Sequence, residues 1–310
     1  MRPCRLTALL LLTLAALCAV PALALFDEGD TGLGGGDAPI AQNLRLDTYK
    51  NVAVTGTLSA ALPGGGEVNY RVTKHPARGA LTFDREGGAG FTYTPYANKT
   101  GKDAFTYVAL DSQGRVSQPA TVEVTITKPA VDVFYQDMAG HPAHKAAIYL
   151  AERGVFTGER LGGVYVFRPE ASVTRQEFLT MAMAAAGQDC PENSLPTGFS
   201  DGDAIAVWAR PYVAAALREG AVRGESAEAR FDPDRPIRQG EAAVILNRLL
   251  RVSDVTAAAE GSLPAWAAQS VRNLEAAGIL TPGGDPDETL TRAEAAVLLD
   301  RAMGLIESRK

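Results

Sequence analysis

Two short stretches of this chain combine a hydroxyl, a cation and a carboxylate at the spacing of a helix start. They consist of Thr174, Arg175 and Glu177, and of Thr291, Arg292 and Glu294. In each stretch a Thr stands three residues ahead of a Glu, just before an apolar run. This is the pattern of a capping box, in which both side chains bond to backbone amides left unpaired at a helix start. We therefore expect two helices to be capped by these Thr and Glu residues.

The arginine in each stretch is not explained by capping. A cation in the first turn of a helix faces the positive end of the helix dipole, which costs a few tenths of a kcal/mol. An Arg beside free backbone amides is a suitable site for a carboxylate or phosphate on a partner. We therefore expect Arg175 and Arg292 to bind an anionic ligand. Replacing Arg175 should leave the fold intact, because the cap residues remain.

The chain begins with the features of a secretory signal peptide over residues 1–24. Arg2 and Arg5 precede an apolar run that ends in small residues at the cleavage positions. Leu17 stands where a lipoprotein would have a small residue before Cys18, so the sequence disfavours a lipid anchor.

Composition excludes several classes of function. The predicted leader holds two of the 30 basic residues and none of the 36 acidic ones, so the remainder carries a net charge of −8 and is a poor candidate for a nucleic-acid binder. No later apolar run is long enough to span a membrane. Cys190 is the one cysteine beyond the leader, so a disulfide scaffold is not expected.

The first half of the chain has the pattern of an all-β domain. Residues 25–37 are acidic and Gly-rich, which predicts a flexible linker. Over residues 38–128 short runs alternate between apolar and polar side chains and are separated by turn signals. Period-two runs at this spacing predict an antiparallel sandwich of about seven strands.

This segment resembles the bacterial immunoglobulin-like and cadherin-like repeats of secreted proteins. The resemblance rests on residues 38–43, 75–79, 91–95 and 101–105. Many relatives bind calcium in a carboxylate-rich loop, but the corresponding loop here holds one acid, Glu67, so no metal site is expected. We interpret the domain mainly as a spacer. The alternative is a module that binds surface proteins or glycans.

Three helical segments follow, and they repeat one another. Aligned on Gly154, Gly220 and Gly278, each has apolar residues four, seven and eleven positions before the glycine, as in an amphipathic helix. Each glycine is expected to end its helix in the left-handed conformation. A second apolar helix is predicted after each. Two short helices cannot bury their own apolar faces, so we expect the three copies to pack together.

At this point the chain is similar to the surface-layer homology family, whose modules hold secreted proteins on the cell wall. The similarity is carried by the two Thr-Arg-x-Glu stretches and by paired positions in the repeats: Asp137 and Asp201, Gly158 and Gly224, Trp208 and Trp266. It implies three repeats, at residues 129–187, 195–252 and 253–310. It also implies a pseudo-threefold bundle whose grooves bind an acidic, pyruvylated secondary cell wall polymer through these residues, Arg175 and Arg292. The expected fold class is thus multidomain, with an N-terminal all-β Ig-like sandwich and a C-terminal, mainly α, pseudo-threefold bundle.

Several positions depart from the repeat pattern. Gln239 stands at the Arg place of the second repeat, so its groove is expected to bind weakly or not at all. His141 and Pro142 replace the Trp of the other repeats, and a metal pair of His141 with His144 is disfavoured because no Cys or carboxylate ligands accompany it. Each Trp is open to two readings, as a core residue or as a platform for a sugar.

These features favour a secreted, non-catalytic protein that is anchored at the cell surface without a cofactor. One alternative is an adhesin whose Ig-like domain binds host or neighbouring cells. Another is an accessory part of a wall-associated enzyme, although no nucleophile with a base, carboxylate pair or metal cluster is evident and the chain has three His in all.

Overall fold

The computed structural model describes residues 38–188, 197–223, 229–252 and 263–310. The predicted signal peptide (1–24) and linker (25–37), together with Cys190 and Gly224, lie outside the described residues.

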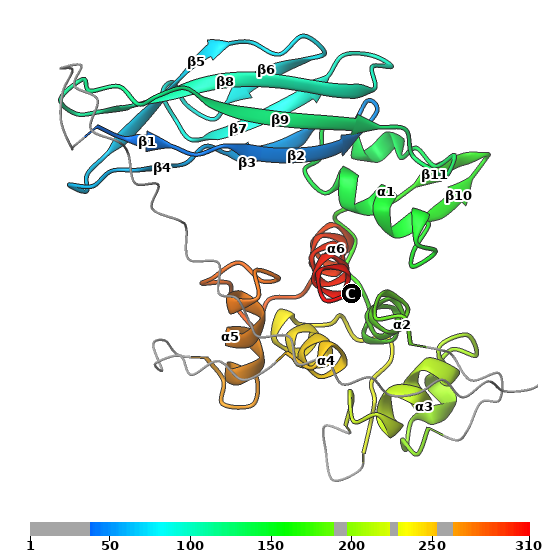
Figure 1. Cartoon of the computed structure of the whole chain (residues 1–310). Helices are drawn as coiled ribbons and strands as arrows, with labels where there is room; N and C mark the ends of the chain where they lie inside the picture. The colour runs from blue at the N-terminus through cyan, green and yellow to red at the C-terminus, as the bar shows by residue number, and fades with distance from the viewer. Residues whose placement is uncertain (1–37, 189–196, 224–228, 253–262) are drawn as a thin grey trace, which may run out of the picture. The chain divides into compact units, whose positions relative to one another are not determined.

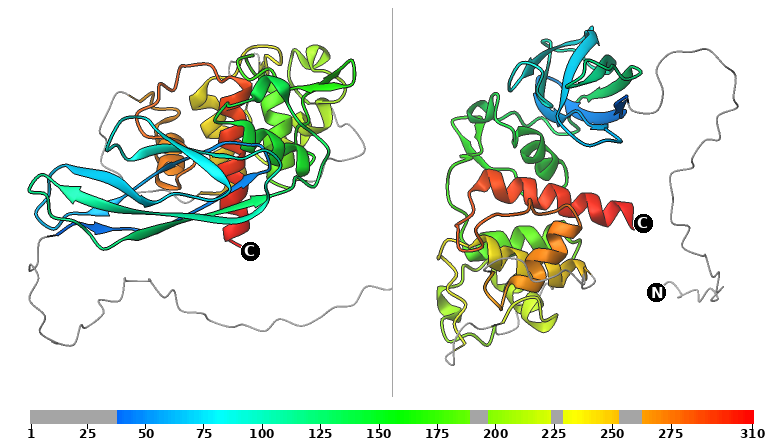
Figure 2. Two further views of the ribbon diagram at one scale, coloured as in Figure 1. Left: turned by 90° about the horizontal axis from the view of Figure 1, so that it is seen from above. Right: turned by 90° about the vertical axis from the view of Figure 1, so that its left-hand side faces the viewer.

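Residues 38–128 form a β-sandwich, seen from different sides in Figures 1 and 2. Its strands are β1 (Ile40–Ala41), β2 (Leu44–Tyr49), β3 (Val54–Thr57), β4 (Ala60–Ala61), β5 (Val68–Lys74), β6 (Gly79–Phe83), β7 (Gly90–Pro95), β8 (Gly101–Asp111) and β9 (Ala120–Thr127). One sheet has the order β2-β9-β8-β5 and the other the order β3-β7-β6, while β1 pairs with β4. The expectation of a purely antiparallel sandwich was wrong at one place, because β2 runs parallel to β9.

The alternating pattern of the strands builds the core of this domain. In β7, Phe91 and Tyr93 are buried while Thr94 is exposed, so one face of the strand carries the apolar rings. The Phe91 ring meets Phe105 of β8 edge to face, with centroids 5.3 Å apart at 85°. This contact joins the two sheets.

From residue 129 onward the described chain is mainly helical. Its elements are η1 (Gln136–Met138), α1 (His144–Glu152), β10 (Glu159–Leu161), β11 (Val164–Val166), α2 (Arg175–Ala185), η2 (Gly202–Ala204), α3 (Arg210–Arg218), α4 (Gln239–Leu250), α5 (Ala268–Ala276) and α6 (Arg292–Ser308). The hairpin of β10 and β11 was not predicted from the sequence.

Helices α1, α3 and α5 end as the glycine pattern predicts. Gly154, Gly220 and Gly278 have φ angles of 67°, 74° and 71°. After each glycine the chain turns back onto the helix that has just ended. In the first repeat, for example, Val155 N donates to Leu150 O at 2.9 Å. Both features are those of a left-handed helix end, so this prediction is confirmed.

The helices pack in a cyclic order. Helices α2, α4 and α6 contact one another, and around them α1 packs on α6, α3 on α2 and α5 on α4. Figure 1 shows this arrangement, and Figure 2 shows α6 (red) against the same group. Each first helix thus covers the second helix of another pair, as expected for segments that cannot bury their own apolar faces.

A ring of hydrogen bonds holds the three second helices at their starts. Val173 N donates to Leu290 O at 3.0 Å, Leu290 N to Ile237 O at 3.0 Å, and Ile237 N to Val173 O at 2.9 Å. All three residues are buried. Because each precedes the first residue of its helix by two positions, the ring brings the starts of α2, α4 and α6 together.

Candidate anion-binding site at the helix starts

The starts of α2 and α6 carry capping boxes. Thr174 N donates to Glu177 Oε2 at 2.9 Å, and Glu177 N donates to Thr174 Oγ1 at 3.4 Å. At α6, Thr291 N donates to Glu294 Oε2 at 2.8 Å, and Glu294 N donates to Thr291 Oγ1 at 3.2 Å. These bonds satisfy the third amide of each helix.

The first two amides of each helix are taken as well, contrary to the sequence-based expectation of free amides. Neighbouring segments supply the carbonyl partners, at 2.8 to 3.1 Å, in the same pattern three times: Arg175 N to Arg235 O and Gln176 N to Pro233 O; Gln239 N to Glu288 O and Gly240 N to Pro286 O; Arg292 N to Ala171 O and Ala293 N to Pro169 O. The helix starts therefore have no spare amides for an anion, and any anion must be bound by side chains.

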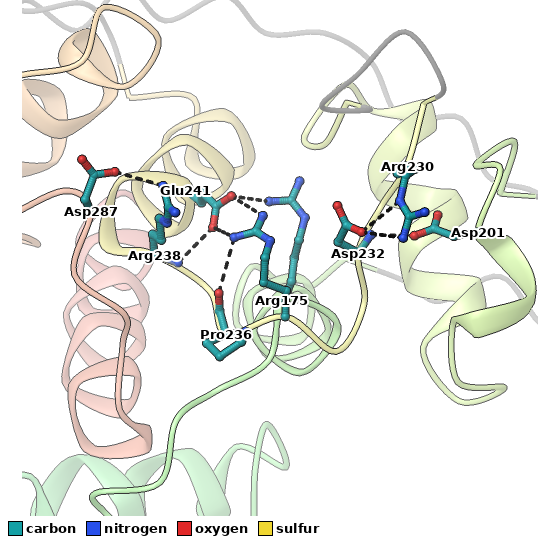
Figure 3. A network of polar contacts seen from close by, with 9 residues as sticks. Arg175, Asp201, Arg230, Asp232, Pro236, Arg238, Glu241 and Asp287 are labelled. Carbon is teal, nitrogen blue, oxygen red and sulfur yellow. Dashed lines mark hydrogen bonds and ion pairs between the residues drawn. The ribbon is translucent and has the colours of Figure 1, made fainter.

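Arg175 joins α2 to α4 through a buried carboxylate, shown in Figure 3. Its Nη1 lies 3.3 Å from Glu241 Oε1, and its guanidinium lies over the Phe231 ring, 5.3 Å from the centroid. Glu241 also accepts from both terminal nitrogens of Arg235, at 2.6 and 3.0 Å, and from Arg238 N at 2.9 Å. Arg175 is 5 % exposed, so the pair is a structural link between two repeats as well as part of a pocket wall.

A pocket of about 420 Å³ opens beside this link. We call it the arginine pocket; its polar and aromatic wall consists of Arg175, Arg223, Arg238, Glu241, Arg248 and Trp266. Among the described residues, the pocket wall holds four guanidinium groups and one carboxylate, and a second acid, Asp287, lies 3.2 Å from Arg238. The balance of charge is positive, so the pocket favours a negatively charged ligand.

Two of these cations are close enough to repel each other. Burial lowers the pKa of Arg248, and the nearby charge of Arg223 lowers that pKa further. A carboxylate bound between them would relieve this repulsion and accept charge-assisted hydrogen bonds.

Trp266 adds a flat apolar surface to the same pocket. Its residue is 54 % exposed, and its ring approaches the backbone of α4 at Gly240, where an added Cβ would lie 3.1 Å from Trp266 Cη2. An indole half open to solvent above a group of arginines can pack against the apolar face of a sugar whose acidic substituent meets the guanidinium groups.

Arg292, the second predicted ligand residue, is already paired within the chain. Its Nη1 lies 3.0 Å from Glu159 Oε1 of the β10–β11 hairpin and donates to Phe167 O at 3.3 Å. Its guanidinium also lies over the Phe156 ring, 5.5 Å from the centroid. The hairpin therefore provides Arg292 with a carboxylate from its own chain.

Gln239 lies in a second pocket, of about 520 Å³, that we call the glutamine pocket. Its wall includes His141, Gln239, Leu280, Glu288, Glu294 and Arg301. In the part of the chain that the structure describes, the wall holds one guanidinium group and two carboxylates, so this pocket lacks the positive charge of the arginine pocket.

Asp137 and Asp201 bind backbone amides of their own repeats. Asp137 accepts from Phe167 N at 3.0 Å and from Arg168 N at 2.6 Å, and Asp201 accepts from Phe231 N and Asp232 N at 2.8 Å each. The last residue of each pair has a positive φ, 56° and 54° respectively, so both acids hold a left-handed bend in the chain leading to the second helix.

Packing requires a glycine at Gly158. Its φ is 69°, and an added Cβ would lie 2.6 Å from Val166 O. The glycine thus lets β11 approach the chain closely.

The two Trp residues are not core residues. Trp208 is 53 % exposed, similar to Trp266, but it does not line either pocket described above. The structure thus brings together Arg175 and Trp266 among the predicted ligand residues. Arg223, Arg238 and Arg248 were missed, although Arg248 follows Glu241 by seven residues and therefore shares its helix face.

Comparisons with known protein families agree with this architecture. Residues 36–127 match the family model described as a bacterial Ig domain, and residues 134–179 and 198–243 match the model of the S-layer homology domain. The chain carries a bacterial Ig domain and S-layer homology repeats. The third helical pair lies beyond the matched residues.

Two curated proteins share parts of this sequence. The S-layer protein EA1 of Bacillus anthracis is 28 % identical over 177 residues, which cover 54 % of this chain and 20 % of that protein. An amylopullulanase of Thermoanaerobacterium thermosulfurigenes is 40 % identical over 89 residues, which cover 28 % of this chain and 5 % of that protein. The chain therefore spans a fifth or less of the length of these relatives.

Solved structures resemble about a third of the chain. An endo-fucoidan hydrolase of glycoside hydrolase family 107 aligns with 32 % of this chain and 14 % of its own, at 20 % identity and a TM-score of 0.26. The fibronectin(III)-like modules of Clostridium thermocellum CbhA align over 29 % and 98 %, at 16 % identity and a TM-score of 0.19. At these scores the likeness carries no argument about function.

The matched domains indicate a protein of the cell surface, anchored to the cell wall. This domain content is typical of non-enzymatic surface proteins. Within the described residues, no helix is long and apolar enough to cross a membrane.

Proposed function

We propose that the helical half of the chain comprises three S-layer homology repeats, at residues 129–187, 195–252 and 253–310, arranged about a pseudo-threefold axis. The family model covers parts of the first two. The third is supported by the hydrogen-bond ring, in which Leu290 makes the same contacts as Val173 and Ile237.

These repeats anchor the protein without a covalent bond, by binding an acidic, pyruvylated secondary cell wall polymer. The observation that carries this proposal is the arginine pocket, whose described wall combines four guanidinium groups and one carboxylate with the exposed Trp266. A pyruvate acetal presents a carboxylate close to a sugar ring, so one unit of the polymer offers both the charge and the apolar face that this wall accommodates.

Arg223 and Arg248 carry the affinity, because both line the pocket and their charges lie close enough to share one carboxylate. Arg175 supports the wall from behind through Glu241. The Ig domain is the part that the anchor displays, and it functions as a spacer. Catalysis is not part of this function.

Sedimentation of the full chain with purified cell walls tests the proposal. The variant Arg223→Ala/Arg248→Ala should lose binding by ten-fold or more, as expected when hydrogen bonds between charged groups are removed. A matched control is Arg71→Ala/Arg85→Ala, which removes two exposed cations from the β-sandwich and the same net charge. Equal loss in both variants, or none in the first, would contradict the proposed site.

Walls stripped of pyruvyl groups provide the second arm. The parent protein should bind them much more weakly, and its binding to intact walls should fall as salt rises, because exposed charges are screened over about 10 Å at 0.1 M salt. Undiminished binding to stripped walls would exclude the acidic polymer as the ligand.

A further inference from the structure

The glutamine pocket occupies the same place relative to α6 as the arginine pocket occupies relative to α4. Gln239 is the first residue of α4, as Arg175 is the first residue of α2. Glu294 corresponds to Glu241, and seven residues further on Arg301 corresponds to Arg248. The two pockets are therefore related positions whose side chains differ.

The differences remove positive charge. Thr281 replaces Arg223, Thr291 replaces Arg238, and Gln239 replaces Arg175 in the aligned positions. Arg301 remains and donates to Ile279 O at 3.1 Å, as Arg248 donates to Ala221 O at 3.3 Å, and it also donates to Thr281 Oγ1 at 3.4 Å. With Glu288 and Glu294 in the wall, a ligand carboxylate would meet more negative than positive charge, which disfavours its binding.

What remains is a wall suited to hydroxyl groups. The amide of Gln239 offers both donors and an acceptor, and Glu288 offers acceptors. The Gln239 amide lies against the backbone at Gly284, where an added Cβ would be 2.8 Å from its nitrogen and oxygen. Leu280, Pro282 and Val297 supply an apolar surface on the same pocket.

We propose that the glutamine pocket binds an uncharged sugar ring of the wall polymer. This assignment rests on the proposed function and extends it. One repeat domain then recognises two different units, an acidic one in the arginine pocket and a neutral one in the glutamine pocket. Two linked contacts raise the overall affinity above that of either alone, because the second binding event is intramolecular.

Titration calorimetry of the full chain with two probes tests this inference. The first probe is a wall-polymer oligosaccharide carrying one terminal pyruvate acetal, and the second is the same oligosaccharide after mild acid removal of the pyruvate. The parent should bind the neutral probe with little dependence on salt. Arg223→Ala/Arg248→Ala should keep that binding while losing the pyruvate-dependent gain in affinity.

Variants of the pocket itself locate the neutral ligand. Gln239→Ala should weaken binding of the neutral probe by roughly five-fold, the effect of one hydrogen bond between uncharged groups. Gln118→Ala, an exposed amide on the β-sandwich, is the matched control and should change nothing. Gly284→Ala, whose new methyl group displaces the Gln239 amide, should reproduce the loss while leaving the melting temperature close to that of the parent.

The outcomes separate the two proposals. Binding of the acidic probe alone, or neutral binding that Gln239→Ala and Gly284→Ala both leave unchanged, overturns the assignment of the glutamine pocket and leaves the arginine pocket standing. If Arg223→Ala/Arg248→Ala keeps full affinity for the acidic probe while Gln239→Ala loses it, the glutamine pocket takes the acid and this inference is wrong. No binding of either probe overturns the proposed function and this inference together.

Discussion

Arg292 Nη1 lies 3.0 Å from Glu159 Oε1, so the start of α6 is linked to the β10–β11 hairpin by an ion pair within the chain. Glu159 also lies 2.9 Å from Arg168. The carboxylate of Glu159 thus forms ion pairs with two guanidinium groups, those of Arg292 and Arg168. An acidic ligand at Arg292 would have to displace Glu159, whereas the arginine pocket is open.

We therefore predict that Arg292 contributes to stability more than to anchoring. Arg292→Ala and Glu159→Gln should each lower the free energy of unfolding, and their effects should be non-additive by about 1 kcal/mol, because the pair is only partly exposed. Urea unfolding of the two single variants and the double variant measures this coupling. Wall binding by Arg292→Ala should remain close to that of the parent. Additive effects on stability, or a ten-fold loss of wall binding, would contradict the prediction.

Glu241 and Glu294 occupy the same capping position but should differ in their effect on stability. Glu241 is 9 % exposed and is bonded to Arg175 and Arg235, while Glu294 is exposed and accepts bonds from Thr291. Glu241→Gln leaves the buried Arg175 and the partly exposed Arg235 without their carboxylate, so we expect a loss of about 3 kcal/mol. Glu294→Gln should lose less than about 1 kcal/mol, because a Gln at this position can still complete the capping box. Equal losses in thermal or urea unfolding would show that Glu241 is no more than a cap.

Arg175→Ala should also destabilise the fold, contrary to the sequence-based expectation. The sequence identified the cap, but the burial of Arg175 beside Glu241 depends on a helix 66 residues further on. The same limit applies to the helix amides. Their carbonyl partners lie in other repeats, and no local pattern in the sequence indicates them.

Features that depend on neighbouring residues were predictable. The glycines that end α1, α3 and α5 and the alternating strands of the sandwich follow from backbone geometry and period. The β10–β11 hairpin carried a signal that was overlooked, since Gly162 and Gly163 separate Leu161 from Val164 as in a two-residue turn. No signal in the sequence indicated that β2 pairs in parallel with β9. The paired residues of these strands are 78 positions apart in the sequence, and strands so far apart can pair in either direction.

His144 should make stability depend on pH below neutrality. It is 2 % exposed at the start of α1, and burial lowers its pKa from 6.5 to about 4, with His141 lowering and Asp137 raising that pKa. The unfolded chain therefore takes up a proton near pH 6.5 that the folded chain takes up only near pH 4. The free energy of unfolding therefore falls by up to about 3 kcal/mol as the pH falls from 6.5 to 4. Above pH 6.5 the residue is neutral in both states, so it does not change the stability.

The variant His144→Leu removes this titration and should flatten the dependence of unfolding free energy on pH between 6.5 and 4. Gln118→Ala, in the β-sandwich, changes no titratable group, so it serves as the control and should keep the slope of the parent. Urea unfolding at half-unit pH steps measures both. An unchanged slope in His144→Leu would show that His144 titrates normally in the folded protein.

Trp266 and Trp208 allow the anchoring site to be tested without any change of charge. The two residues are almost equally exposed, at 54 % and 53 %, and each precedes the first helix of its pair by two residues. Trp266 lines the arginine pocket and Trp208 does not.

Trp266→Ala should therefore weaken binding to the acidic wall polymer by about three- to ten-fold, the loss expected when an aromatic ring no longer packs on a sugar. Trp208→Ala should bind as the parent does, and both variants should melt at similar temperatures because neither ring is in the core. If the two variants lose affinity equally, the polymer is bound outside the arginine pocket.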